Sequence, residues 1–490
     1  MAAVTVFVAS GAVLVLEILG LRLIAPYVGV TLQTNSAVIG VALAAIATGA
    51  WLGGQAADLV NPRAVLGPLV LIAGVLSLLT LPLVRYAGEA IGEAAGSAPA
   101  STVVVLAVLA VFAPALLLSA VPPMVVKLQL GDLRRTGEVV GKLSGLGTVG
   151  AIMATFVTGF VLVAALPSTA IVLGLGGLLV VGGAGLALLL ATGRPRRGAA
   201  GVAALAVAGA GLTLAAPTPC DVETAYHCAS VVADPLRPSG RTLQLDTLAH
   251  SYVDLEDPTY LEFEYVQAIA SLADVTAPRA QPLDALYLGG GGLTLPRYLR
   301  HTRPNSSQLV LEVDGGVIEV DEQRLGLRTG KGLRVRVQDA RVGLAGQPGR
   351  SRDLVVGDAF GGLAVPWHLT TRETAQEVRR VLDAEGVYAM NVIDWPPNRF
   401  VRAEVATLRS VFAHVAVLGT TEAVQGRDGG NFVLLASDRP LPLDALQAML
   451  ARRETPYEIA SGQAVKAFAG AASVLTDDHA PVDQLITTTY

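Results

Sequence analysis

The feature that most constrains this chain is a succession of long apolar runs that fills its first 216 residues. A helix needs about 20 apolar residues to cross the roughly 30 Å hydrocarbon core of a bilayer. The last run is short and rich in alanine and glycine, so the sequence is compatible with either six or seven spans. We expect a multispan α-helical membrane bundle of about seven transmembrane helices. They are predicted at residues 4–27, 36–58, 64–84, 101–122, 143–165, 169–192 and 198–216.

Composition separates this membrane half from the rest of the chain. Only 15% of the residues are charged, whereas about a quarter are charged in an average soluble domain. The deficit lies in residues 1–216, while residues 217–490 have ordinary globular composition. The net charge of −5 gives no sign of nucleic-acid binding. We therefore expect no nucleic-acid partner, but a lipid bilayer around the first half.

Basic residues gather in the loops on one side of the predicted bundle. Lysine and arginine in short loops mark the cytoplasmic side, and the opposite loops contain Arg85 alone. With seven spans, this places the C-terminal domain of a multi-pass cell-membrane protein outside the cytoplasm. The eight residues of the basic side are Arg63, Lys127, Arg134, Arg135, Lys142, Arg194, Arg196 and Arg197.

The only two cysteines, Cys220 and Cys228, lie just beyond the last apolar run. In an exported domain such a pair predicts a disulfide, while in the cytosol free thiols or a metal site would be expected. A zinc site usually needs four ligands, and His227 is the single histidine nearby. We predict a disulfide and no metal.

Two ionisable residues, Glu17 and Arg22, fall within the first predicted span. Ionisable residues at membrane depth are expensive and often functional. The alternative is structural: Arg22 either extends to the membrane surface or pairs with Glu17.

The C-terminal half divides into residues 217–284, a small β-rich unit, and residues 285–490, where strands alternate with helical patterns. Such alternation predicts a mostly parallel, doubly wound sheet. Thr370 and Glu373 form a capping-box pattern for one of its helices, which we expect to end at Gly386. Strands are predicted at 285–289, 308–313, 333–337, 353–357, 386–392, 413–419 and 431–436.

A polar or flexible residue lies at the end of, or just after, each of the first four predicted strands. In a parallel sheet, ligands bind beyond the carboxyl ends of the strands. The glycine run Gly289–Gly292 would allow close backbone approach, and Glu312 stands at the usual distance for an acid that binds ribose hydroxyls. Asp339 and Asp358 follow the next two strands. The series predicts a nucleoside-shaped pocket, while helix capping is the alternative for each carboxylate.

These residues resemble the spermidine synthases, and the stretches LEILGLRLIAPYVG and LTDDHAPVDQLI resemble the bacterial subfamily fused to a membrane bundle. The resemblance implies an α/β class I methyltransferase-like (Rossmann-like) domain with a small N-terminal β unit. It implies no tightly bound cofactor, but decarboxylated S-adenosylmethionine or a related nucleoside as co-substrate and a small-molecule amine as substrate. Related synthases are commonly oligomers, so a homo-oligomer is an expectation of the same kind.

The resemblance also implies a role for each site residue. Gly289, Gly290 and Gly291 would hold the donor, together with Glu312 at its ribose and Asp339 at its adenine. Asp358 would help to deprotonate the acceptor amine, Tyr265 would orient it, and His227 would line the acceptor side.

The sequence departs from the family pattern at two acids. The family loop reads GGGDGG, but Gly292 stands at the position of its aspartate. The family motif after the fourth strand, as in DSSDP, has a second aspartate where this chain has Gly361.

Three functions are therefore weighed. The first is a membrane-anchored spermidine synthase-like transferase that moves an aminopropyl or related group to an amine, with Asp358 as general base. The second is a catalytically degenerate, extracytoplasmic binding or assembly module. The third is a transporter with a regulatory soluble domain.

Overall fold

The computed structural model describes residues 1–92, 100–131, 133–190, 199–278 and 281–487. The chain forms two compact units, Met1–Cys228 and Ala229–Tyr490, and each is described by itself. The predicted basic residues Arg194, Arg196 and Arg197 lie outside the described residues.

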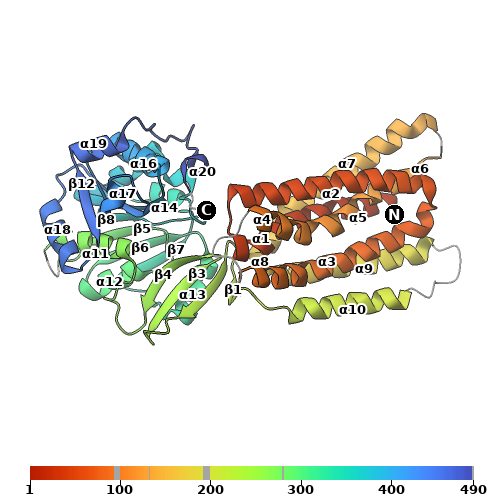
Figure 1. Cartoon of the computed structure of the whole chain (residues 1–490), viewed down its shortest axis with the longest axis horizontal. Coiled ribbons are helices and arrows are strands. Elements are labelled where there is room, and N and C mark those ends of the chain that lie inside the picture. The colour runs from red at the N-terminus through yellow and green to blue at the C-terminus, as the bar shows by residue number, and fades with distance from the viewer. Residues whose placement is uncertain (93–99, 132, 191–198, 279–280, 488–490) are drawn as a thin grey trace. The chain divides into compact units, whose positions relative to one another are not determined.

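The first unit is a bundle of helices (Figure 1). Within the described part of the chain, six helical segments are long and apolar enough to cross a membrane: Ala2–Val28, Leu32–Leu59, Pro62–Ile91, Ala100–Gln129, Thr136–Ala165 and Ser168–Leu190. The seventh predicted span corresponds to α10, whose apolar part, Ala204–Ala215, is shorter. The bundle is thus compatible with a membrane protein, and the seventh span stays a prediction.

The helices of this unit follow the predicted runs closely, and the fourth and fifth runs each contain several consecutive helical segments. The elements are α1 (Ala2–Val28), α2 (Leu32–Leu59), α3 (Pro62–Gly92), α4 (Ala100–Ala107), η1 (Val108–Phe112), α5 (Ala113–Ser119), α6 (Val121–Gln129), η2 (Leu133–Arg135), α7 (Thr136–Val157), η3 (Thr158–Leu162), α8 (Val163–Ala165), α9 (Ser168–Leu190), α10 (Ala199–Ala215) and β1 (Val222–Glu223).

Small residues let these helices approach closely. A Cβ atom on Gly150 of α7 would lie 2.4 Å from the carbonyl oxygen of Phe7 on α1. Only glycine fits such a backbone contact, which is typical of helix pairs in membranes.

Arg22 of α1 extends to the segment that follows α10. Its guanidinium donates to the carbonyl oxygens of Thr224 at 2.7 Å and Ala225 at 2.8 Å. Glu223 of the same segment accepts from Arg85 at 3.4 Å and from the backbone N–H of Ser168 at 2.6 Å. This segment is therefore held to one end of the bundle by charged groups, an arrangement that the sequence patterns did not predict.

The second unit contains an eight-stranded mixed sheet in the order β12-β10-β11-β9-β8-β5-β6-β7. Strands β7, β6, β5, β8 and β9 are parallel, whereas β11 is antiparallel to both of its neighbours. Before the large sheet, β2, β3 and β4 form an antiparallel meander. The strands are β2 (Cys228–Ala233), β3 (Gly240–Leu245), β4 (Leu248–Asp254), β5 (Asp284–Leu288), β6 (Ser307–Glu312), β7 (Leu333–Val337), β8 (Arg352–Gly357), β9 (Leu382–Asp394), β10 (His414–Thr420), β11 (Gly430–Ser437) and β12 (Tyr457–Ser461).

Helices cover both faces of this sheet (Figure 1), so two hydrophobic cores form. Alternate residues of β5 serve the two cores, because successive side chains of a strand point to opposite faces: Leu286 and Leu288 pack in one, Ala285 and Tyr287 in the other. The helices are α11 (Glu264–Thr276), α12 (Thr294–Thr302), α13 (Gly315–Arg324), α14 (Ala340–Ala345), η4 (Trp367–Leu369), α15 (Arg372–Val381), α16 (Arg399–Arg409), α17 (Thr421–Val424), α18 (Leu443–Arg452), α19 (Gln463–Ala469) and α20 (Val482–Leu485).

The predicted α/β sheet with helices on both faces is confirmed, with two reversed strands, β11 and β12, that the periodicity could not reveal. One helix boundary was predicted wrongly. Thr371, not Thr370, caps α15 by accepting from Thr374 N, while the hydroxyl of Thr370 donates to the carbonyl oxygen of Trp367. The helix ends at Val381 rather than near Gly386, because β9 already begins at Leu382 and continues the sheet.

Candidate functional site

The glycine run begins where β5 ends, and its first residue must be glycine. Gly289 has φ +102°, and a Cβ there would lie 2.2 Å from the carbonyl oxygen of Asp358. Gly291 also has a positive φ, of 47°. Side chains other than hydrogen are strained in this region, so the loop can pass close to the end of β8 only with glycine.

Glu312, the last residue of β6, is fixed beside this loop. Its Oε2 accepts from the backbone N–H of Gly290 at 2.7 Å, and its Oε1 accepts from the N–H of Asp314 at 2.8 Å. The parallel register of β5 and β6, with Leu288 opposite Leu311, brings the two strand ends together. The predicted pairing of glycine loop and acid thus exists as a direct contact.

Asp339 follows β7 and serves as the N-cap of α14. Its Oδ1 accepts from Val342 N at 3.0 Å, and its Oδ2 lies 3.1 Å from His368 Nε2. Its side chain is 40% exposed. Helix capping, the structural alternative for this residue, is therefore present, and the exposed carboxylate remains accessible at the same edge of the sheet.

Asp358, the residue after β8, stands among polar partners from distant segments. Its Oδ2 accepts from the Tyr265 hydroxyl at 3.3 Å, and its Oδ1 accepts from Asn391 Nδ2 at 2.9 Å. Burial raises the pKa of Asp358 to about 6, against the two hydrogen bonds, which lower it. A carboxylate with a pKa near neutrality is suited to accept a proton.

Asn391 was missed by the sequence analysis. It is only 2% exposed and interrupts the apolar stretch 387–393 within strand β9. A polar amide inside a buried strand is unusual, and this is the signal that could have identified it.

A pocket brings several of these residues together. Asp358, Tyr265, Gly289 and Gly290 line it, and no other predicted site residue does. The lining residues that the sequence analysis did not select come from β4, α11, α12 and neighbouring segments. They are Ser251, Tyr252, Glu262, Phe263, Val266, Ile269, Tyr287, Thr294, Leu295, Pro296 and Val356.

His227 belongs to the first compact unit, in the loop closed by the cysteines. Its backbone N–H donates to the Thr224 hydroxyl oxygen at 2.8 Å. The predicted disulfide between Cys220 and Cys228 is confirmed. The role of His227 at the acceptor stays a prediction.

Gly292 and Gly361 stand where the resemblance would place acids, and the backbone N–H of each donates a hydrogen bond. The N–H of Gly292 donates to the Ser251 hydroxyl oxygen at 2.9 Å, and the N–H of Gly361 donates to the carbonyl oxygen of Ala364 at 2.9 Å. In the described part of the chain, no group of three or more His, Cys, Asp or Glu residues could hold a metal ion.

Comparison with known proteins places this chain near the aminopropyltransferases. No protein-family model matches the sequence. The polyamine aminopropyltransferase of Vibrio vulnificus (strain CMCP6) is 31% identical over 164 residues, which cover 33% of this chain. The chain spans about half, 52%, of that relative's length.

Two solved structures complete this comparison. A probable spermidine synthase from Corynebacterium glutamicum ATCC 13032 is 28% identical, with a TM-score of 0.49 over 52% of this chain and 95% of its own. A spermidine synthase in complex with the transition-state analogue AdoDATO is 18% identical, with a TM-score of 0.33 over 49% of this chain and 80% of its own. The Vibrio relative confirms the predicted resemblance to spermidine synthase-like transferases.

Proposed function

We propose that the chain is a membrane-anchored transferase that moves an aminopropyl or closely related group from a nucleoside sulfonium donor to an amine. One observation supports this most directly. Asp358, with a pKa raised to about 6, lines the same pocket as Tyr265 and the glycine loop. A group that can accept a proton thus stands beside a backbone loop that a large ligand can approach.

The donor would lie along the edge formed by the ends of β5, β6 and β7. Glu312 would accept hydrogen bonds from the ribose hydroxyls, and Asp339 from the adenine amino group. Val313, which follows Glu312, and Val337, two positions before Asp339, are 42% and 60% exposed. Exposed apolar side chains between two carboxylates would pack against a purine ring, as ligand sites combine apolar walls with a few polar groups.

The reaction needs no metal and no redox partner. The acceptor nitrogen attacks the carbon attached to the sulfonium sulfur, so a carbon–nitrogen bond forms and the carbon–sulfur bond breaks. The bonding electron pair stays on sulfur, which leaves as a neutral thioether. Asp358 takes the proton that the amine loses, while Tyr265 and Asn391 hold its carboxylate in place.

The bundle would anchor this unit to the cell membrane, with the C-terminal domain outside the cytoplasm. The disulfide near the end of the bundle supports an oxidising compartment, since such bonds persist there.

Calorimetry and a transfer assay on the full-length protein in detergent test this proposal. The ligands are S-adenosylmethionine, its decarboxylated form and methylthioadenosine, with putrescine as acceptor. Glu312→Ala should weaken nucleoside binding roughly 10- to 100-fold, because charge-assisted hydrogen bonds to the ribose are lost. Asp358→Asn should keep nucleoside binding and lower transfer roughly 10²- to 10⁴-fold, the usual contribution of a general base.

Asp444→Asn is the matched control, because Asp444 is an exposed aspartate on α18 outside the pocket. Equal loss in D444N and D358N, or full activity in D358N, would overturn the role of Asp358. A wild-type protein that binds none of the nucleosides would instead favour the degenerate binding module, which the glycines at positions 292 and 361 suggest.

A further inference from the structure

The candidate pocket contains a second carboxylate that the family resemblance did not assign. Among its described lining residues, Asp358 and Glu262 are the two acids. Asp358 is partly buried at the end of β8, whereas Glu262 is exposed just before α11. The two acids of this pocket thus differ in their exposure to solvent.

We propose that Glu262 is the specificity-determining residue for the acceptor, and that it binds a second cationic group of an acceptor with two or more amines. This inference rests on the proposed function. A single amine would need only Asp358, whereas two carboxylates of one pocket match the charges of a dication. Glu262 would thereby supply a negative charge that Gly361 cannot.

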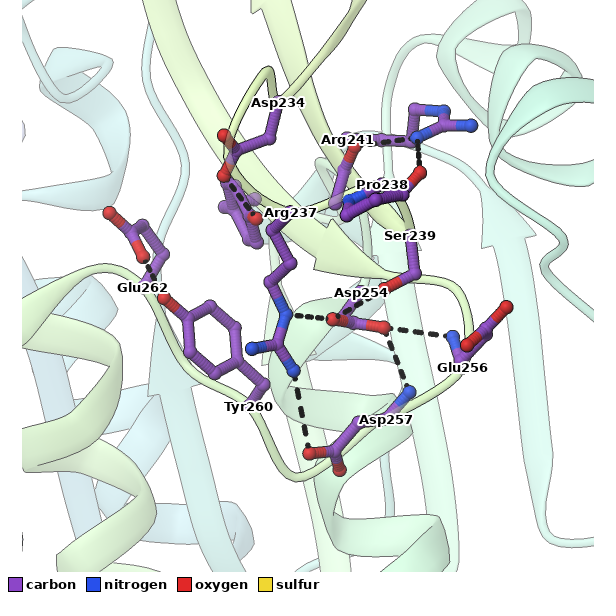
Figure 2. Close-up of polar contacts among 12 residues, drawn as sticks. Asp234, Arg237, Pro238, Ser239, Arg241, Asp254, Glu256, Asp257, Tyr260 and Glu262 are labelled. Atoms are coloured by element: carbon purple, nitrogen blue, oxygen red, sulfur yellow. Dashed lines mark hydrogen bonds and ion pairs between the residues drawn. The ribbon is translucent and has the colours of Figure 1, made fainter.

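Glu262 accepts a hydrogen bond from Tyr260, and Tyr260 is itself part of a set of contacts (Figure 2). Glu262 Oε2 accepts from the Tyr260 hydroxyl at 2.5 Å. The guanidinium of Arg237 lies over the Tyr260 ring, 3.7 Å from its centre. Arg237 in turn donates to Asp254 and lies 3.7 Å from Asp257. One oxygen of Glu262 is thus held in place, and within the described part of the chain Oε1 has no hydrogen-bond partner.

The base of this arrangement is Asp254, whose side chain is fully buried. Its Oδ1 accepts from the backbone N–H groups of Glu256 and Asp257, both at 2.9 Å. Burial alone would raise the pKa of Asp254, but the hydrogen bonds from Arg237 and these backbone groups lower it to about 2. Asp254 therefore remains charged and keeps Arg237 over the tyrosine ring.

Tyr260 can act only as a donor toward Glu262 at neutral pH. The hydrogen bond to Glu262 raises the pKa of the Tyr260 hydroxyl further above its usual value near 10. Since one oxygen of Glu262 accepts the hydrogen bond from Tyr260, the other oxygen can accept a hydrogen bond from an ammonium group. A charge-assisted hydrogen bond of this kind is roughly twice as strong as a neutral one.

Steady-state kinetics of Glu262→Gln with a diamine and a monoamine of equal chain length, 1,4-diaminobutane and 1-aminobutane, test the inference. The amide keeps the size of the side chain and removes its charge. We expect KM for the diamine to rise at least about tenfold, with kcat within about twofold, and KM for the monoamine to stay unchanged. Tyr260→Phe should raise KM for the diamine in the same direction by a smaller factor, since it frees the oriented carboxylate.

Glu264→Gln is the matched control, because Glu264 is an exposed acid two residues away and does not line the pocket. An unchanged KM for the diamine in E262Q, or equal losses for both amines, would overturn the inference. Nucleoside binding measured on the same variant separates this outcome from failure of the proposed function, which would appear as no transfer and no nucleoside binding in the wild-type protein.

Discussion

At the scale of single residues, the chemistry of the site depends on how Asp358 is surrounded. Burial penalises its charged form, and Asn391 and Tyr265 partly offset that penalty by donating hydrogen bonds. The result is a carboxylate that is mostly ionised at pH 7 and still basic enough to accept a proton. Because the folded pKa, about 6, lies above the ordinary value of 3.8, ionisation of Asp358 destabilises the fold as the pH rises through 6.

The same balance predicts the pH dependence of transfer. In the wild-type protein, kcat/KM should rise with pH around a midpoint near 6, where Asp358 loses its proton. Asn391→Ala removes a hydrogen bond that stabilises the ionised carboxylate, so the pKa of Asp358 and the midpoint should move to higher pH. The measurement is kcat/KM between pH 5 and about 9 with saturating donor.

The plateau at high pH is the internal control for this variant. A shifted midpoint with the plateau kept indicates that Asn391 sets the pKa of Asp358. An unshifted midpoint, or a uniform loss at every pH, would contradict that role and leave Asn391 as a packing residue.

At the scale of elements, the ends of three parallel strands create the site. Gly289 follows β5, Glu312 ends β6, and Asp358 follows β8; β5 lies between the other two in the sheet. Parallel strands place their carboxyl ends at one edge, so residues far apart in sequence meet there. The glycine loop must pass close to Asp358, which makes the loop intolerant of a side chain.

Gly289→Ala should therefore disturb both stability and donor binding. The positive φ costs about 1–2 kcal/mol for alanine, and the 2.2 Å approach of its Cβ to Asp358 adds a backbone clash. We expect a lower midpoint of thermal unfolding and nucleoside binding weakened at least about tenfold. Differential scanning calorimetry and titration calorimetry of the full-length protein measure both.

Gly361→Ala is the comparison for this variant, because a Cβ at Gly361 would meet nothing within 4 Å. It should leave the unfolding midpoint and nucleoside affinity close to those of the wild type. If G289A behaves like G361A, the close approach of the loop to Asp358 is not required.

At the scale of the whole molecule, the side of the membrane determines which substrates can reach the pocket. The loop charges and the disulfide are independent arguments for an extracytoplasmic C-terminal domain. An accessibility tag attached after Tyr490, which lies outside the described residues, should be labelled by an impermeant reagent in intact cells. A tag between α6 and α7 should be labelled only after the cells are opened.

The reverse pattern would overturn this orientation and place the site in the cytosol, where decarboxylated S-adenosylmethionine is made. Equal labelling of both positions in intact cells would contradict an odd number of spans between the two tagged positions. Either result leaves the residue-scale predictions testable, because they concern the pocket alone.

The sequence alone determined the class of each half of this protein. Long apolar runs dictate membrane-length helices, and alternating strand and helix patterns dictate a layered sheet, because both signals arise from neighbouring residues. The positions of Glu312 and Asp358 in the sheet could be predicted for the same reason: Glu312 ends one recognisable strand and Asp358 follows another. The disulfide was predictable because the chain has only two cysteines.

The surroundings of these acids, in contrast, depend on how distant segments pack together. Asp358 meets Asn391, 33 positions later, and Tyr265, 93 positions earlier. Glu262 accepts from Tyr260, and the guanidinium of Arg237, from a more distant segment, lies over the ring of that tyrosine. Hydrogen bonds and burial between distant segments set the pKa and the orientation of a side chain, and these follow from how the elements pack rather than from the residues beside it.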